Sequence, residues 1–427
     1  MKSIAIILSG LVLSAAAEVD MLACNPGEDC ATEARIVWHS TDAACTLHCA
    51  RAGEERRPFE VPCAKQRCPV AFLNGGTDYY KYTATLKGLR PGTEYLYWVA
   101  EGGRNTPHQR FRTAGRSGKF NFLWISDVHA HHDKPLKMTN VAAIVECARR
   151  ATASSGGIDF VLFSGDMVKY GARYDDWRQW NGSVVQTDYM RADVTGNKEY
   201  YETGKPTHNH DKWFLAVHNN PPNGADGIGA SYWFLYDGVL FLCIDSRASE
   251  GREMPSDVRR EALARQMAWF ERAVSSQRGR FRRLVVCQHD PWFLYNNAKG
   301  RGHVRRWAPL FDRYNVDLAL SGDDHNYLRT KPLKWSADEE RFVPDGDGTV
   351  YMVASMVDET SHTSTVTTDM GAIDGTEMAD ILAAYGTSGA TYGAIVVSVG
   401  PAAIKVKCVW NRKDGGGYDV LDSFEAR

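Results

Sequence analysis

The chain has 427 residues, of which 44% are hydrophobic and 24% are charged, and its formal net charge is −2. This length suffices for two or three domains with a large core, and the composition excludes a disordered chain. The charge balance gives no broad basic surface of the kind that binds nucleic acid, so we expect no nucleic-acid partner.

The N-terminus is typical of a secretory signal peptide. Lys2 precedes a small and apolar run that ends in three alanines at residue 17, before the acidic Glu18 and Asp20. The run is too short to span a bilayer, and no later stretch is apolar enough to do so. We therefore predict that residues 1–17 are removed. The mature protein is expected to be secreted or periplasmic and to have no membrane partner.

Residues 18–114 are predicted to form a small all-β domain. "ARIVWHS" and "EYLYWVAEG" alternate as strands do, and Pro91-Gly92 marks a turn before the second run. Six of the ten cysteines crowd into this part of the chain, at positions 24, 30, 45, 49, 63 and 68. In a secreted protein such a cluster indicates disulfides, with a structural zinc site as the competing interpretation. The other four, Cys147, Cys243, Cys287 and Cys408, lie in apolar runs and are expected in the core.

After a small polar linker at 113–119, residues 119–427 show an α/β pattern. "KFNFLWIS", "IDFVLFSGD", "FRRLVVCQHD" and "VDLALSGDD" are predicted buried strands, and "SYWFLYDGVLFLCIDS" a hairpin that turns at Asp237-Gly238. Residues 258–276 predict an amphipathic helix, with Leu263, Met267, Phe270 and Val274 on one face. Residues 357–391 are rich in Ser, Thr, Gly and Asp and are predicted to be a long loop or insertion.

Polar side chains of one chemical kind follow five of the predicted segments. They are Asp127 and His129, Asp166, Asn197, His289, and finally Asp323, Asp324 and His325. Sites in α/β sheets gather beyond the carboxyl ends of strands. Carboxylate, amide and imidazole groups without a thiol suit Mn, Fe or Zn, so we expect a metal site there.

The order D-x-H, G-D, G-N, H and G-x-x-H resembles the calcineurin-like metallophosphoesterase superfamily. The β domain in front and "GDDHNYLRT" late in the chain make it most similar to purple acid phosphatases with an N-terminal fibronectin type III-like domain. The resemblance implies an α/β fold, a four-layer α/β/β/α sandwich behind the β domain.

The resemblance also implies roles for these residues. Asp127, His129, Asp166 and His325 are expected to bind one metal ion, and Asp166, Asn197, His289 and Asp323 the other. The cofactors would be two divalent or trivalent ions of Fe, Mn or Zn, which activate a water for in-line attack on phosphorus. Lys198, Asp166 and Asn197 are the expected catalytic residues. Lys198, His131 and His210 are the expected contacts to a small phosphorylated substrate.

Three positions depart from the family pattern. Lys169 stands where purple acid phosphatases have a tyrosine ligand, and His129 is expected to take that coordination position. Asp323 replaces a histidine ligand, and a carboxylate still binds a divalent metal. Lys198 replaces a histidine that faces the phosphate, and an ammonium group with three donors suits the same anion.

These features favour a secreted, dinuclear metal-dependent phosphatase that hydrolyses phosphomonoesters. A phosphodiesterase or nucleotidase with the same site is the nearest alternative. A degenerate phosphate- or glycan-binding protein is the alternative from a different class, because two motif positions are substituted.

Overall fold

The computed structural model describes residues 19–68, 70–73, 79–202, 211–251, 254–293, 304–354, 372–373, 376–386, 393–411 and 417–426. The predicted signal peptide lies outside these residues. No helix in the described ranges is both long and apolar enough to cross a membrane.

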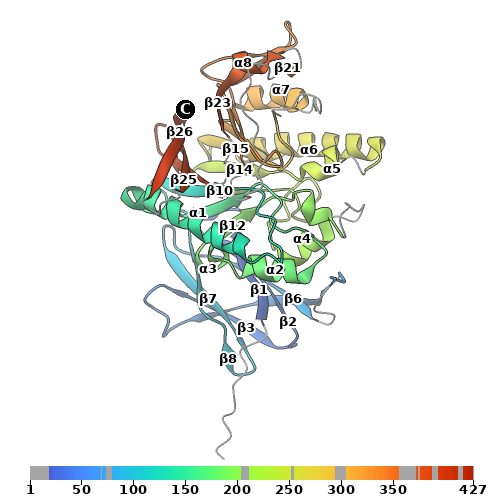
Figure 1. Cartoon of the computed structure of the whole chain (residues 1–427). Coiled ribbons are helices and arrows are strands. Elements are labelled where there is room, and N and C mark those ends of the chain that lie inside the picture. The colour runs from blue at the N-terminus through green and yellow to red at the C-terminus, as the bar shows by residue number, and fades with distance from the viewer. Residues whose placement is uncertain are drawn as a thin grey trace, which may run out of the picture.

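The first part of the chain forms two antiparallel sheets, as predicted for an all-β domain (Figure 1). One sheet has the order β1-β2-β6-β5 and the other β4-β3-β7-β8, with β9 pairing with β7. The strands are β1 (Val19–Pro26), β2 (Ala34–Ser40), β3 (Cys45–Arg51), β4 (Phe59–Val61), β5 (Cys63–Arg67), β6 (Tyr80–Leu86), β7 (Glu94–Glu101), β8 (Arg104–Asn105) and β9 (Gln109–Arg112). Alternate residues such as Ile36, Trp38, Tyr95 and Tyr97 fill the core between the sheets.

The predicted disulfides are not formed in this structure, where all ten cysteines are free thiols. Cys24, Cys30 and Cys49 are buried in the hydrophobic core and pack there as small apolar side chains. The closeness of these cysteines in the sequence was therefore a poor guide to disulfide formation in this structure. The four later cysteines are buried, as expected for core residues.

Two larger sheets follow. The six-stranded sheet has the order β12-β11-β10-β24-β25-β26 and the seven-stranded sheet β13-β14-β15-β16-β20-β17-β23. The first contains β10 (Phe120–Ile125), β11 (Phe160–Phe163), β12 (Met190–Asp193), β24 (Gly393–Val399), β25 (Ile404–Asn411) and β26 (Tyr418–Ala426). The second contains β13 (Tyr232–Tyr236), β14 (Val239–Cys243), β15 (Arg283–Cys287), β16 (Leu318–Ser321), β17 (Tyr327–Thr330), β20 (Val350–Val353) and β23 (Leu382–Gly386). Two small pairs are β18 (Leu333–Ser336) with β19 (Arg341–Pro344) and β21 (Ala372–Ile373) with β22 (Thr376–Glu377).

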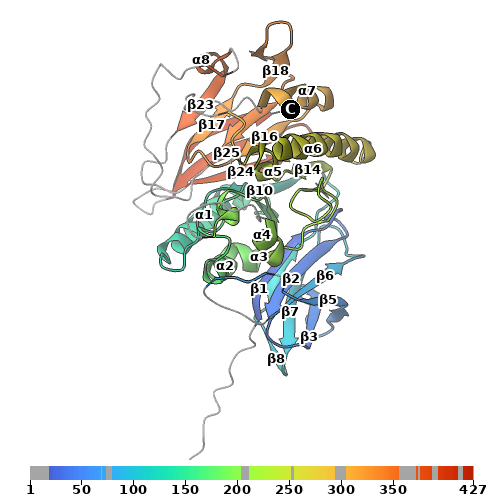
Figure 2. The ribbon, with the colours of Figure 1, turned by 90° about the vertical axis from the view of Figure 1, so that its right-hand side faces the viewer.

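The sheets pack against each other, and helices cover their outer faces (Figures 1 and 2). Along β10, Phe122 and Trp124 belong to the core between the sheets, whereas Leu123 and Ile125 pack with the helices. The helices are α1 (Leu136–Thr152), α2 (Tyr174–Asn181), α3 (Val184–Asp188), α4 (Asp211–Val217), α5 (Ser246–Glu250), α6 (Ser256–Ser276), α7 (Val304–Tyr314) and α8 (Met378–Ile381), with 3-10 turns η1 (Ala153–Ser155) and η2 (Lys198–Tyr200). This is the predicted four-layer sandwich.

Several local predictions are confirmed. The hairpin β13–β14 turns at Asp237 and Gly238, which both have positive φ. In α6, Leu263, Phe270 and Val274 are buried as the amphipathic pattern predicted, and Met267 is partly buried against the same core. Part of 357–391 was wrongly predicted as loop, because Leu382–Gly386 pairs with β17 as an edge strand. Residues 355–371, 374–375 and 387–392 lie outside the described part of the chain.

The polar linker at 113–119 is fixed rather than loose. Asp237, in the hairpin turn, accepts a hydrogen bond from the Gly118 backbone N–H at 2.9 Å. The β domain also pairs directly with the larger domain, since Cys30 N–H donates to the Leu235 carbonyl at 3.0 Å and Leu235 N–H to that of Glu28 at 2.8 Å. The two domains therefore form a continuous packed unit.

Candidate metal centre

The structure brings all seven predicted metal ligands to one place. The strands that precede them, β10 to β12 and β14 to β16, run parallel within each sheet, so their carboxyl ends meet at one edge. The ligands lie just beyond these ends: Asp127, His129, Asp166, Asn197, His289, Asp323 and His325. Residues that follow strands of two different sheets, and that are almost 200 positions apart in the sequence, thus lie close together.

Asp127, His129 and His325 make up what we call the first donor group. One ligand atom from each lies within 4.8 Å of the others. Asp127 Oδ1 is 3.3 Å from His325 Nε2 and 3.9 Å from His129 Nε2. Asp127 is fully buried, and its Oδ1 has no hydrogen-bond partner in the described part of the chain.

The second donor group consists of Asp166, Asn197, His289 and Asp323. His289 Nε2 lies 3.3 Å from Asp166 Oδ1, 3.6 Å from Asp323 Oδ1 and 3.1 Å from Asn197 Oδ1. Asp166 connects the two groups, because its Oδ2 is 3.0 Å from His129 Nε2. Its place between them is the place of a bridging carboxylate.

The contacts within the second group orient its side chains. His289 donates its Nδ1–H to the Ser164 carbonyl at 2.7 Å, which directs Nε2 toward the other donors. The Asn197 side-chain amide lies 2.8 and 2.9 Å from the two Asp166 carboxylate oxygens, and its NH2 group donates to them when the Asn197 oxygen faces Lys198 Nζ at 3.0 Å. Turned the other way, the amide would offer its oxygen to a bound ion.

The pKa values of His289 and Asp166 show how opposite charges in the cluster stabilise one another. Burial lowers the pKa of His289, yet the carboxylates of Asp166, Asp127 and Asp323 raise it well above its ordinary value. Burial raises the pKa of Asp166, but His289, His129 and Lys198 outweigh it and hold that pKa low. The pocket therefore favours deprotonated carboxylates with positive charge between them.

The backbone around the donors is strained. Five of the seven, Asp127, His129, Asp166, Asp323 and His325, have φ between 49° and 66°. Such left-handed conformations are uncommon for residues with a Cβ and gather at functional sites. Gly196 is required for another reason, since a Cβ there would lie 2.2 Å from Asp166 Oδ1. The loops are built so that the donors approach closely.

Lys198 lies beside the second donor group. Its Nζ is 3.9 Å from Asp166 Oδ2 and 4.6 Å from the centre of the Tyr201 ring, and 18% of its side chain is exposed. Burial lowers the pKa of Lys198, but Asp166 and other acidic neighbours raise it above its ordinary value, so the ammonium is charged. Lys198 therefore points toward the donors and not into solvent.

The structure adds one residue that the sequence analysis did not assign. Glu199 is fully buried and accepts hydrogen bonds from the backbone N–H groups of Asp166, Gly196 and Val168 at 2.9, 2.7 and 3.2 Å. Burial raises the pKa of Glu199 to about 7. Glu199 holds the loops of two donors together. Its place beside Asn197 and Lys198 was the only sequence signal.

His131, a predicted substrate contact, lies among aromatic neighbours. His131 stacks on His132 and meets the Tyr170 ring edge-on, in a separate cluster. His210 lies outside the described residues. Tyr170, one position beyond the missing tyrosine ligand, stacks under Arg173, with 4.6 Å from the guanidinium carbon to the ring centre.

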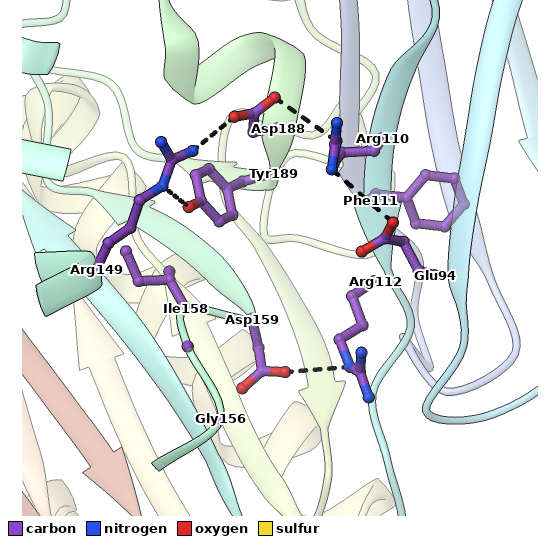
Figure 3. Close-up of a pocket in the computed structure, with 11 residues that line it drawn as sticks. Glu94, Arg110, Phe111, Arg112, Arg149, Gly156, Ile158, Asp159, Asp188 and Tyr189 are labelled. Carbon is purple, nitrogen blue, oxygen red and sulfur yellow. Dashed lines mark hydrogen bonds and ion pairs between the residues drawn. The ribbon is translucent and has the colours of Figure 1, made fainter. Parts of the chain in front are cut away.

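A cavity of about 460 Å³ lies between the β domain and the larger domain (Figure 3). Its arginines pair with acidic side chains around the rim: Arg149 with Asp188 at 2.6 Å, Arg110 with Asp188 at 3.8 Å and Arg112 with Asp159 at 3.5 Å. None of the seven donors lines it. We therefore assign the cavity to the domain interface and the chemistry to the donor cluster.

Comparison with known proteins agrees with the geometry. The model of the calcineurin-like phosphoesterase family matches residues 120–327. Over 346 residues the chain is 23% identical to an uncharacterized protein of Mycobacterium tuberculosis, covering 74% of this chain and 63% of that one. It is 24% identical over 248 residues to a nucleotide pyrophosphatase/phosphodiesterase of Hordeum vulgare, covering 49% and 60%. The chain thus spans less than two thirds of the length of these relatives.

The fold is similar to that of two solved structures. Purple acid phosphatase from yellow lupin (Lupinus luteus) seeds matches with a TM-score of 0.68 at 16% identity, over 96% of this chain and 74% of that one. PhoD matches with a TM-score of 0.57 at 11% identity, over 96% and 94%. Both matches extend through the β domain as well as the larger one.

Proposed function

The chain carries a calcineurin-like phosphoesterase domain, and on this basis we propose that it is a secreted or periplasmic phosphatase that hydrolyses phosphomonoesters at a dinuclear metal centre. The observation that carries the proposal is the convergence of two donor groups on Asp166. A site that had lost its function would not be expected to keep seven ligand-type side chains together.

Asp127, His129 and His325 would hold one ion, Asn197, His289 and Asp323 the other, and Asp166 would contact both. When bound, the two ions supply charge to the phosphoryl oxygens and lower the pKa of the attacking water. Ser164 orients His289 through its carbonyl, and Glu199 fixes the loops of Asp166 and Asn197. The protein thereby supplies a preorganised site.

Lys198 supplies a further cation at the same place. Its ammonium, beside Asp166, is suited to contact the phosphoryl oxygens of the substrate. It would bind the phosphate and stabilise the charge that develops on the leaving oxygen. Both functions depend on the side chain pointing into the site, as it does here.

Hydrolysis of phosphodiesters is the second candidate activity, because the Hordeum vulgare relative is named a nucleotide pyrophosphatase/phosphodiesterase. An aryl phosphate monoester and the corresponding bis-aryl diester separate the two. We expect a larger kcat/KM for the monoester. A larger kcat/KM for the diester would show that the protein is a phosphodiesterase.

Phosphate or glycan binding without turnover is the third candidate. Against it, the replacements at Asp323 and Lys198 keep a metal-binding acid and a phosphate-binding cation. Metal analysis of the purified protein tests this directly, with about two ions per chain expected at the two donor groups. A protein without bound metal and without hydrolysis would be a binder.

Secretion is proposed from the N-terminal sequence and has its own test. The mature protein should begin at Glu18 after export. N-terminal sequencing of protein from the cell exterior or periplasm shows whether residues 1–17 have been removed.

A further inference from the structure

A second group of metal-binding side-chain types lies outside the seven donors. One ligand atom each from His131, His132 and Asp133 lies within 4.8 Å of the others. Asp133 Oδ1 is 3.3 Å from His132 Nε2, and Asp133 Oδ2 is 4.0 Å from His131 Nδ1, which accepts a hydrogen bond from the Asp133 backbone N–H at 3.3 Å. The two imidazole rings are stacked, with centroids 4.9 Å apart. The proposed hydrolysis uses none of these contacts.

Asp176, from the first turn of α2, orients one of these ligands. Its Oδ1 accepts hydrogen bonds from His132 Nδ1–H at 2.7 Å and from the His132 backbone N–H at 3.0 Å. With Nδ1–H donated to Asp176, Nε2 is the His132 nitrogen that faces Asp133 Oδ1, at 3.3 Å. A carboxylate that fixes a histidine in this way is the common support of a metal-binding imidazole.

The charge at Asp176 calls for a cation nearby. Its carboxylate is fully buried, and its Oδ2 has no hydrogen-bond partner among the described residues. Asp133 adds a second carboxylate, and the guanidinium of Arg173, at the start of α2, is stacked on the Tyr170 ring. A buried carboxylate is costly unless positive charge compensates it.

We propose that His131, His132 and Asp133 bind one divalent transition-metal ion, separate from the dinuclear centre, with Asp176 as the residue that orients His132. Two imidazoles and one carboxylate form a donor set that suits zinc and leaves a position for water. The ion would fasten the loop that follows His129 to the first turn of α2.

The test counts zinc ions bound by the metal-stripped full-length protein. His132→Gln and Asp133→Asn should each bind one ion fewer per chain than the unmodified protein. Asp133→Asn is the safer variant for folding, since 70% of the Asp133 side chain is exposed. Asp176→Asn should weaken binding of that ion by about 10- to 100-fold. His108→Gln, which alters an exposed histidine of the β domain, is the control and should leave the count unchanged.

The same count in an Asp166→Asn background separates this proposal from the proposed function. The ion at His131, His132 and Asp133 should remain there, and Asp133→Asn should remove it. If His132→Gln and Asp133→Asn bind as many ions as their parents, the cluster is only a hydrogen-bonded histidine pair and the proposal is wrong. Cobalt(II) provides a second readout, because its visible absorption depends on its ligands. The absorption of the ion bound at His131, His132 and Asp133 should disappear in Asp133→Asn.

Discussion

The two donor groups share Asp166 but differ in composition and in exposure. The first is built from Asp127, His129 and His325, where His129 is expected to take the coordination position of the tyrosine that Lys169 replaces. The second includes Asp323, with 32% of its side chain exposed, and has Lys198 beside it. The two groups thus depart from the family pattern in different ways, and only in the second does a change lie where the substrate phosphate is expected to bind.

Asp166→Asn should have the largest effect, because it removes the charge that both groups share. We expect kcat to fall on the order of 10⁴-fold, as when one member of a catalytic unit is lost. Metal content should fall at both groups. Steady-state kinetics with metal analysis measures both. If the variant keeps full activity, Asp166 has no role in the reaction and is not the ligand that the two donor groups share.

Lys198→Ala tests the change that lies in the second group. If the ammonium assists the leaving group, kcat/KM on an alkyl phosphate should fall about 10²-fold or more, and on an activated aryl phosphate much less. Equal losses on both esters would indicate that Lys198 only binds the phosphoryl oxygens. Lys87→Ala, at an exposed lysine of the β domain, is the matched control. No loss on either ester would place Lys198 outside the reaction.

Asp323→Ala should weaken metal binding at the second group and spare the first. Removal of one ligand-type side chain is expected to cost about 10- to 100-fold in affinity for one ion. Asp324→Ala is the matched control one position away. Metal titration of the stripped protein distinguishes them. If Asp324→Ala weakens binding and Asp323→Ala does not, the ligand has been assigned to the wrong residue.

Metal removal should lower the stability of the protein. At a free-ion concentration of 100 times the Kd, each ion that binds only the folded state adds about 2.7 kcal/mol to the free energy of unfolding. Denaturant titration with and without a chelator measures the gain. His325→Ala and Asp323→Ala should each lose a part of it. The measurement is made in an Asp133→Asn background, so that the third proposed ion does not contribute. A full gain that survives both variants there would show that the ions act at other sites.

The sequence indicated the fold and the donors well because both leave local patterns. Buried strands are continuous apolar runs, and the residue that ends each strand is adjacent to it in sequence, so Asp127, Asp166 and His289 could be found individually. The cysteine cluster misled because six nearby cysteines say nothing about the distances between their sulfur atoms. Segment Leu382–Gly386 was missed because its short run of small residues becomes a strand only by pairing with β17.

By itself, the amino-acid sequence determined the sandwich of strands and helices, the types of side chain at the strand ends and the substitutions at Lys198 and Asp323. Only the tertiary structure decided that Asp166 lies between two donor groups, that Glu199 holds their loops and that Asp176 turns His132 toward Asp133. The reason is physical. Ligand chemistry is a property of single residues, whereas the meeting of these side chains in one cluster depends on contacts between residues far apart in the chain.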